Sequence, residues 1–233
     1  METLEKKDEQ LIEDQGALNA KMQRRSFLRF AGAGAAAVGV LAACKKHDDT
    51  VTNSTIDVGS GDIGVLNYAY ALEQLEAAFY IKVVASPYSG MTAAELSAFT
   101  DIRDHEVLHR EFLKAALGTS AIPALGVNFS SIDFTSKAAV LAAAKGFEDT
   151  GVSAYNGVAY VMTNPTYLTL AGKIVSVEAR HAAFIRDMIT ANSFADSTVV
   201  DTTNALDKSR KPSEVLPIVA VYLTTSISAS KLP

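Results

Sequence analysis

Two copies of one short pattern, Glu-x-x-His, carry the clearest chemical signal in this sequence. One copy is Glu106 with His109, the other is Glu178 with His181, and each lies among apolar residues at helical spacing. A step of three residues places both side chains on one side of a helix. A buried carboxylate is costly unless it is paired, protonated or bound to a metal. The two pairs therefore predict metal ligands inside a helical core.

A further acid on an apolar helical face precedes each pair. Glu73 precedes the first pair, with Glu76 also on the inner face, and Glu148 precedes the second. The order Glu, Glu-x-x-His, Glu, Glu-x-x-His indicates one helical hairpin that is used twice. Four carboxylates and two imidazoles are hard donors that suit Fe or Mn. Two divalent ions would also neutralise the four acids.

Four long helical patterns must position these residues. The patterns share apolar residues at steps of three and four, and they span about 62–85, 92–117, 136–162 and 166–191. Thr92 begins a capping-box pattern. The irregular stretch 119–135 predicts a long connection, and 215–223 predicts a short fifth helix or a packed extended segment. We therefore expect an all-α four-helix bundle over 62–192, with a C-terminal extension, 193–233, packed on it.

This arrangement resembles the core of ferritin-like dinuclear carboxylate proteins. Three segments are similar to the desiccation-related, ferritin-like family of exported bacterial proteins: Leu72–Tyr80, Phe147–Gly157 and Val177–His181. The resemblance implies six metal ligands: Glu73, Glu106, His109, Glu148, Glu178 and His181. Glu106 and Glu178 would bridge two metal ions, and the other four would each bind one. Glu76 would be a spare ligand or a replacement for Glu73.

The sequence departs from that family beside the ligands. Many members have Asp directly before the Glu of a Glu-x-x-His pair, as a partner to a ligand His, whereas His105 and Val177 stand there in this chain. Tyr80 lies seven residues after Glu73, where ferritins often keep a Tyr beside the metal. Tyr80 or Tyr155 would donate an electron or a hydrogen bond to bound oxygen. The alternative is that both are core tyrosines with satisfied hydroxyls.

Three functions fit these residues. The first is a dinuclear centre, with Fe expected and Mn possible, for ferroxidase-type or peroxidase-type redox chemistry with O2 or H2O2. The second is a metal-free or incidentally metallated bundle with a structural or desiccation-protective role. The third is a zinc hydrolase, because His105-Glu106-Val107-Leu108-His109 matches H-E-x-x-H. The zinc hydrolase reading leaves the second Glu-x-x-His pair unexplained.

The first 43 residues predict an export leader. Arg24 and Arg25 precede an apolar run, 31–43, that is too short to span a bilayer. This order resembles a twin-arginine signal that ends in a lipobox, in which Cys44 would carry a lipid. Residues 44–61 would form a flexible tether. We therefore expect an exported protein, anchored by lipid to a membrane on the periplasmic side or at the cell surface.

The composition limits the partners further. The net charge of the 233 residues is -5, whereas a general nucleic-acid binder needs a basic surface. A single Cys excludes an internal disulfide framework and a cysteine-built zinc site. We expect no nucleic-acid partner. An oligomer is possible, but a lipid on every N-terminus would hinder assembly of a storage cage.

Overall fold

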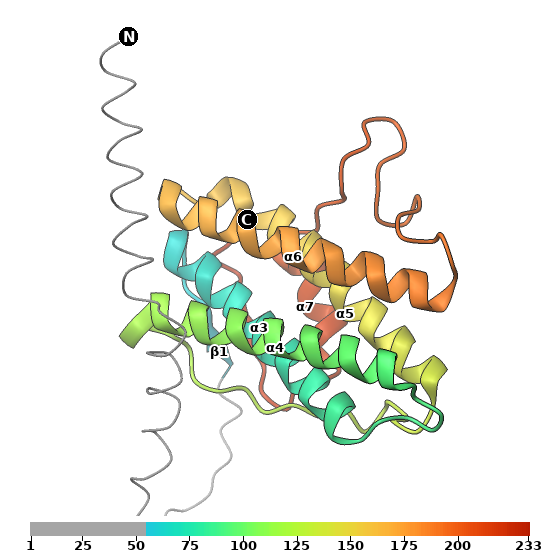
Figure 1. Cartoon of the computed structure of the whole chain (residues 1–233). Coiled ribbons are helices and arrows are strands. Elements are labelled where there is room, and N and C mark those ends of the chain that lie inside the picture. The colour runs from blue at the N-terminus through green and yellow to red at the C-terminus, as the bar shows by residue number, and fades with distance from the viewer. Residues whose placement is uncertain (1–54) are drawn as a thin grey trace, which may run out of the picture. The chain divides into compact units, whose positions relative to one another are not determined.

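Four long helices run side by side in the computed structural model, which describes residues 55–233 (Figure 1). They are α3 Gly61–Ala85, α4 Ala93–Leu117, α5 Lys137–Val158 and α6 Pro165–Ile189. The pairs α3–α4 and α5–α6 each form a helical hairpin. This architecture confirms the predicted all-α bundle with a long connection between its second and third helices. The predicted export leader and the predicted lipid site at Cys44 lie outside the described residues.

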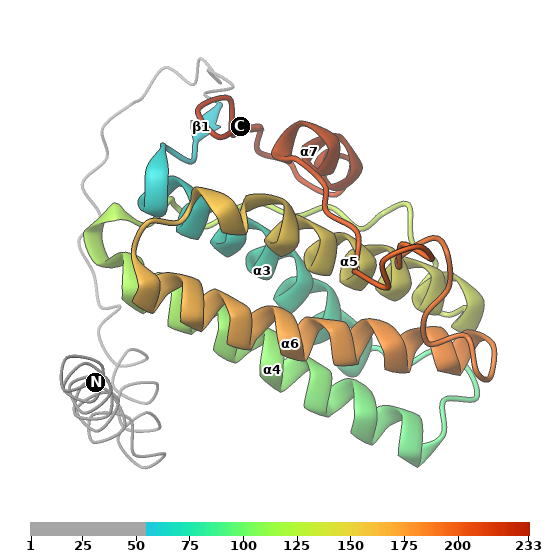
Figure 2. The same ribbon diagram turned by 90° about the horizontal axis from the view of Figure 1, so that it is seen from above.

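The helices form two layers of different burial. Figure 2 shows α3 and α5 in one layer and α4 and α6 in the other, with α7, Pro212–Ala220, on the outer side of α3 and α5. Every residue of α3 from Gly64 to Ala77 is buried. The helices α4 and α6 bury only their inner faces. The two hairpins therefore face each other through the buried helices α3 and α5 in one layer and through the more exposed helices α4 and α6 in the other.

Local sequence signals set several helix ends. The Thr92 side chain accepts a hydrogen bond from the Glu95 amide at 3.2 Å, and the Glu95 carboxylate accepts one from the Thr92 amide at 2.8 Å. This is the capping box that the sequence predicts. Asn164 caps α6, whose first residue is Pro165. The third helix ends at Val158 and continues only as a 3-10 turn, Ala159–Val161, so it is shorter than expected.

The returning C-terminal chain explains why α5 carries Gly157. A Cβ atom at Gly157 would lie 1.8 Å from the carbonyl oxygen of Arg210. The Arg210 amide also donates a hydrogen bond to the Ser153 carbonyl at 2.9 Å. Only a glycine leaves room for this close backbone approach. The C-terminal extension is thereby fixed against the third helix of the bundle.

The predicted tether, 44–61, extends too far into the domain. Strand β1, Ile56–Asp57, pairs in parallel with β2, Ile227–Ser228, and Val58 is fully buried. Ile56 and Val58 alternate with a polar residue, so one face of this short segment is apolar and packs on the core. The polar average composition of the segment hides that alternation. The domain therefore begins several residues before the first helix.

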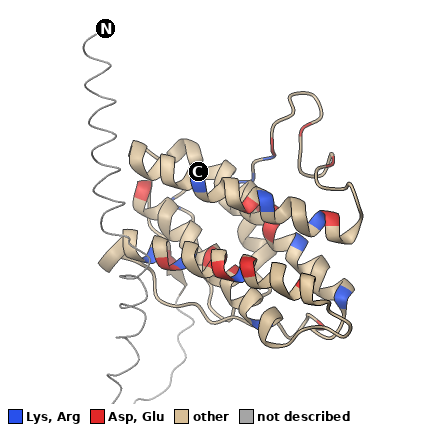
Figure 3. Ribbon diagram, in the orientation of Figure 1, with Lys and Arg blue, Asp and Glu red and all other residues tan. Residues whose placement is uncertain are grey.

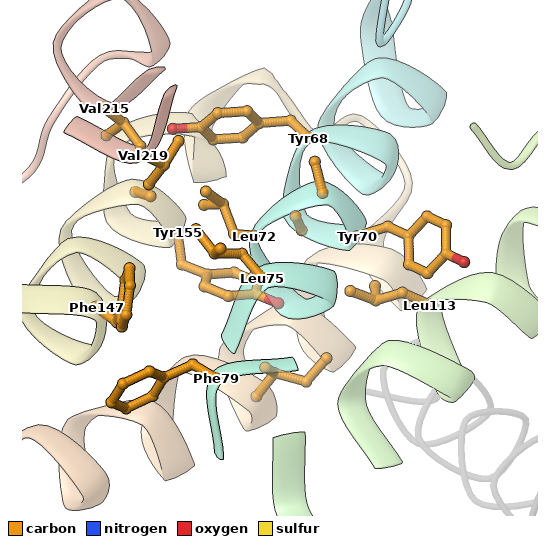
Figure 4. Close-up of a cluster of buried hydrophobic side chains, with 14 of the residues drawn as sticks. Tyr68, Tyr70, Leu72, Leu75, Phe79, Leu113, Phe147, Tyr155, Val215 and Val219 are labelled. Carbon is orange, nitrogen blue, oxygen red and sulfur yellow. The ribbon is translucent and has the colours of Figure 1, made fainter. Parts of the chain in front are cut away.

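A cluster of apolar side chains holds α7 and both hairpins together. Figure 4 shows Val215 and Val219 of α7 beside Tyr68 of α3. The rings of Phe79 and Phe147 join α3 to α5, with their centroids 4.9 Å apart. The α7 helix thus confirms the expected packed segment, although it begins before residue 215.

No helix within residues 55–233 is long and apolar enough to cross a membrane.

A buried arginine fastens the loop that follows α6. The guanidinium of Arg186 is almost inaccessible and donates two hydrogen bonds to Asp149 of α5, both at 2.8 Å. It donates a third to Asp196 in the loop at 3.0 Å. Such planar, bidentate pairing offsets the cost of burying the charge. The arginine therefore links α5, α6 and the start of the C-terminal extension.

Candidate metal centre

Buried carboxylates and imidazoles meet in the middle of the bundle. Acidic positions, red in Figure 3, lie on both α4 and α6. Four glutamates have no exposed surface, and each of the four long helices supplies one: Glu73, Glu106, Glu148 and Glu178. Among the histidines, His181 is also buried, and the side chain of His109 is 13% exposed. Among these six residues, His109 on α4 is thus the one most accessible to solvent.

The donor atoms fall into two groups that share two residues. In each group, one ligand atom per residue lies within 4.8 Å of the others. The first group is Glu73, Glu106, His109 and Glu178. The second group is Glu106, Glu148, Glu178 and His181. All six residues predicted as ligands are therefore brought together, and Glu106 and Glu178 belong to both groups.

Each imidazole faces a shared carboxylate from the other hairpin. His109 Nδ1 on α4 lies 2.8 Å from Glu178 Oε1 on α6. His181 Nδ1 on α6 lies 2.9 Å from Glu106 Oε1 on α4. The backbones of α4 and α6 approach each other less closely than the backbones within either hairpin. These side chains therefore span the wider gap between the two exposed helices.

Two tyrosines cross between the hairpins in the buried layer. The Tyr80 hydroxyl of α3 donates to Glu148 Oε1 of α5, and the Tyr155 hydroxyl of α5 donates to Glu73 Oε1 of α3, both at 2.5 Å. The other oxygen of each carboxylate lies 3.5 Å from the histidine Nδ1 of its own group. Burial first, and then the neighbouring carboxylates, raise the pKa of both tyrosines well above 10, so both remain donors.

The other carboxylate oxygens of the four glutamates, and one nitrogen of each imidazole, lack hydrogen-bond partners in the part of the chain that the structure describes. Within residues 55–233, the unsatisfied buried atoms include Glu73 Oε2, Glu148 Oε2, both oxygens of Glu106 and Glu178, and Nδ1 of His109 and His181. The imidazoles and carboxylates are close, but they are not aligned as hydrogen bonds. Buried polar atoms without partners are costly and rare. Oxygen and nitrogen atoms that converge in this way could hold metal ions.

The electrostatics of the residues alone show the same need for positive charge. Burial first, and then Glu178 and Glu73, raise the pKa of Glu106 well above its usual range. Burial and Glu73 raise the pKa of Glu178 to about 8. Burial opposes protonation of His109, but Glu178 and Glu73 outweigh it and raise its pKa to about 10. Without metal, bound protons thus reduce the negative charge that metal cations would otherwise neutralise.

Glu76 lies beside the centre but belongs to neither group. It is 3% exposed, and its Oε2 atom has no hydrogen-bond partner among residues 55–233. A Cβ atom at Gly151 would lie 3.0 Å from Glu76 Oε1 and 3.6 Å from Glu178 Oε2. Gly151 therefore leaves the space that Glu76 occupies. The donor groups contain Glu73 and not Glu76, and a role of Glu76 as a spare ligand stays a prediction.

His105 makes a contact that the sequence does not reveal. Its Nδ1 atom lies 2.9 Å from Nε2 of His181, and the two ring planes are inclined by only 8°. Neither donor group contains His105, so the two histidines of H-E-x-x-H do not share a group. The one hint in the sequence is its position, directly before Glu106. The corresponding position before Glu178 is Val177, which offers no side-chain hydrogen bond.

A family model described as a ferritin-like domain matches residues 61–191. The matched range runs from the first residue of α3 to just beyond α6 and contains every member of the two donor groups. No curated protein matches the chain significantly.

Proposed function

The chain belongs to the ferritin-like family, and on that premise we propose that its buried centre binds two iron ions, with manganese as the alternative metal. We propose that the loaded centre performs ferroxidase-type or peroxidase-type redox chemistry with O2 or H2O2. A pair of Fe(II) ions can together supply the two electrons for such a reaction. The observation that carries the proposal is the pair of donor groups that share Glu106 and Glu178.

The residues of the chain have separate roles in this proposal. Glu106 and Glu178 would hold both metal ions, and their two carboxylates would offset half of the charge of two divalent ions. Tyr155 and Tyr80 donate hydrogen bonds that fix the carboxylates of Glu73 and Glu148. Because burial keeps both tyrosines protonated, each can hold a proton close to the centre without losing its contact. Electron donation by either tyrosine is a further part of the proposal, and Tyr→Phe variants test it.

Anaerobic titration with Fe(II) tests the metal site first. The metal-free protein should bind two Fe(II) ions per chain, and addition of O2 or H2O2 should then change the visible spectrum while the oxidant is consumed. Two bound ions without any reaction would contradict the redox part only. A folded protein that binds neither Fe(II) nor Mn(II) would contradict the whole proposal and favour the metal-free structural bundle.

We also propose that the protein is exported and anchored by a lipid on Cys44. The support is the order of Arg24, Arg25, the apolar run and the lipobox in the sequence. Expression in a bacterium should place the wild-type protein in the membrane fraction, and Cys44→Ser should release it. A wild-type protein whose Cys44 carries no lipid by mass spectrometry would contradict the proposal. Because such an anchor would hinder assembly of a closed cage, we propose that the protein performs redox chemistry at a membrane surface rather than iron storage.

A further inference from the structure

His105 lies on the exposed side of α4, about one turn before His109, which is the most exposed member of the donor groups. Its side chain is exposed, whereas His181, which it contacts, is 5% exposed. Among residues 55–233, the polar side-chain contacts that join α4 directly to α6 are three: His109 with Glu178, His181 with Glu106, and His105 with His181. Two of these three involve only members of the donor groups. The third brings in His105, which belongs to neither group.

The geometry of His181 determines what His105 can do. His181 Nδ1 faces Glu106 and Glu148, so this is the nitrogen that belongs to the second donor group. A neutral imidazole that offers Nδ1 to a metal carries its proton on Nε2. That Nε2 atom lies 2.9 Å from His105 Nδ1, while the ring centroids are 5.1 Å apart and the ring planes nearly parallel. The two rings therefore meet edge to edge, as an in-plane hydrogen bond requires. His105 Nδ1 is therefore placed to accept the proton of His181.

We propose that His105 is a positioning residue that fixes the tautomer and the ring orientation of His181 for metal binding. The inference rests on the proposed metal centre. Partners of this kind fix a ligand imidazole and strengthen its bond to the metal. A neutral imidazole is a weaker acceptor than a carboxylate, but it needs no compensating charge at the exposed rim of the centre.

The second hairpin offers no equivalent partner. The position directly before Glu178 is Val177, whose side chain cannot accept a proton from His109. Among residues 55–233, no hydrogen bond joins a side chain to Nε2 of His109, although Nδ1 of His109 faces Glu178 and Glu73. The two metal positions therefore differ in how firmly their histidines are held. We infer that the position with His181 binds metal more tightly than the position with His109.

Titration of the metal-free protein with Mn(II) alone tests this inference, with free Mn(II) followed by its electron paramagnetic resonance signal. The wild-type protein should bind two ions per chain. His105→Ala should weaken one of the two binding steps by about 10- to 100-fold and leave the other unchanged. His105→Asn should recover most of the loss, because its Oδ1 atom lies near the place of His105 Nδ1. Val177→Ala, the matched control on α6, should bind both ions as the wild-type protein does.

The outcomes separate this inference from the proposed function. A wild-type protein that binds no Mn(II) or Fe(II) would overturn both. Two ions bound with the same affinities by wild type and His105→Ala would overturn the positioning role alone. Equal losses in His105→Ala and His105→Asn would also overturn it, since a hydrogen-bond acceptor would then make no difference.

Discussion

The two helical hairpins, α3–α4 and α5–α6, each give the centre four corresponding side chains. Each supplies a Glu, a Tyr seven residues later, and a Glu-x-x-His pair on the following helix. Two of the positions at which the hairpins differ lie close to the predicted ligands. Glu76 in the first hairpin corresponds to Gly151 in the second, and His105 corresponds to Val177. The members of the two donor groups are thus nearly symmetric, whereas the residues around them are not. Any difference between the two proposed metal positions must therefore come from these surroundings.

The largest effect should come from substitution of a residue that belongs to both donor groups, because it disturbs both proposed metal positions. Glu106 belongs to both donor groups, whereas Glu148 belongs to one. We expect Glu106→Gln to weaken both metal-binding steps by more than about 100-fold, beyond the effect of losing an outer partner. Glu148→Gln should weaken only the step that uses His181. Metal content after anaerobic reconstitution measures both.

A control on the same helix makes this test specific. Glu111 lies on α4 within the exposed layer, pairs with Arg110, and belongs to neither donor group. Glu111→Gln should therefore keep two metal ions per chain. The shared role of Glu106 would be refuted if Glu106→Gln retained one ion at wild-type affinity.

Raising the pH should destabilise the metal-free protein, because it removes the bound protons that reduce the negative charge of both donor groups. The pKa of Glu178 is raised from 4.5 to about 8, so the stability from its bound proton is present below pH 4.5 and lost as the pH rises to about 8. The pKa of His109 is raised from 6.5 to about 10, so its contribution is full below pH 6.5 and lost as the pH rises to about 10. Both groups therefore act in the same direction.

Urea unfolding of chelator-treated protein measures this dependence. The free energy of unfolding should fall steadily from about pH 6 to about pH 9. Free metal at 100 times the Kd measured at pH 6 should stabilise the loaded protein by about 2.7 kcal/mol at that pH. At the same metal concentration, the difference between the two forms should widen as the pH rises, because metal competes with protons for the centre. A metal-free protein that became more stable over this range would contradict the protonated centre.

The sequence predicts those parts of the molecule that depend on local spacing. Thr92 begins a capping box within one turn of α4, so the start of that helix can be read directly. The Glu and His residues predicted as ligands repeat on apolar helical faces, so their convergence follows from packing those faces together. These features need only neighbouring residues and one assumption, that apolar faces meet.

Features that depend on distant residues were missed. The pairing of Ile56 with Ile227 joins the two ends of the domain through strands of two residues, which are too short to give a periodic signal. The contact of His105 with His181 depends on how closely α4 and α6 approach. The third helix ends early where Arg210 returns to it, and no local signal marks that end.

The difference between Glu76 and Gly151 predicts that the effect of Gly151→Ala on stability changes sign when Glu76 is replaced by alanine. A Cβ atom at Gly151 would lie 3.0 Å from Glu76 Oε1, so Gly151→Ala should crowd that carboxylate at a cost of about 1–3 kcal/mol. Alanine also favours a helix over glycine by about 1 kcal/mol. Gly151→Ala should therefore destabilise the wild-type protein but stabilise a Glu76→Ala variant.

Urea unfolding of the four proteins in this double-mutant cycle gives the coupling energy. Glu76→Ala supplies the space into which the new methyl group fits, and it also removes a buried acid whose pKa is raised by burial and by Glu178. Purely additive effects of Gly151→Ala and Glu76→Ala would show that the two positions do not depend on each other.

The smallest expected effect is the difference between the two tyrosines, which are equivalent in the two hairpins. Tyr80→Phe and Tyr155→Phe each remove one hydrogen bond to a carboxylate in the opposite hairpin. A net hydrogen bond contributes about 0.5–1.5 kcal/mol, so each variant should weaken one Mn(II)-binding step by about 10-fold or less, and by nearly equal amounts.

Combination with His105→Ala identifies which step each tyrosine affects. Tyr80 contacts Glu148, which shares a donor group with His181, the residue that His105 contacts. Tyr80→Phe with His105→Ala should therefore concentrate both losses in one binding step. Tyr155→Phe with His105→Ala should instead weaken both steps, because Tyr155 contacts Glu73 in the other group. If the two double variants gave the same Mn(II) titration, the hydrogen bonds would not act on separate metal positions, and the two halves would behave as one site.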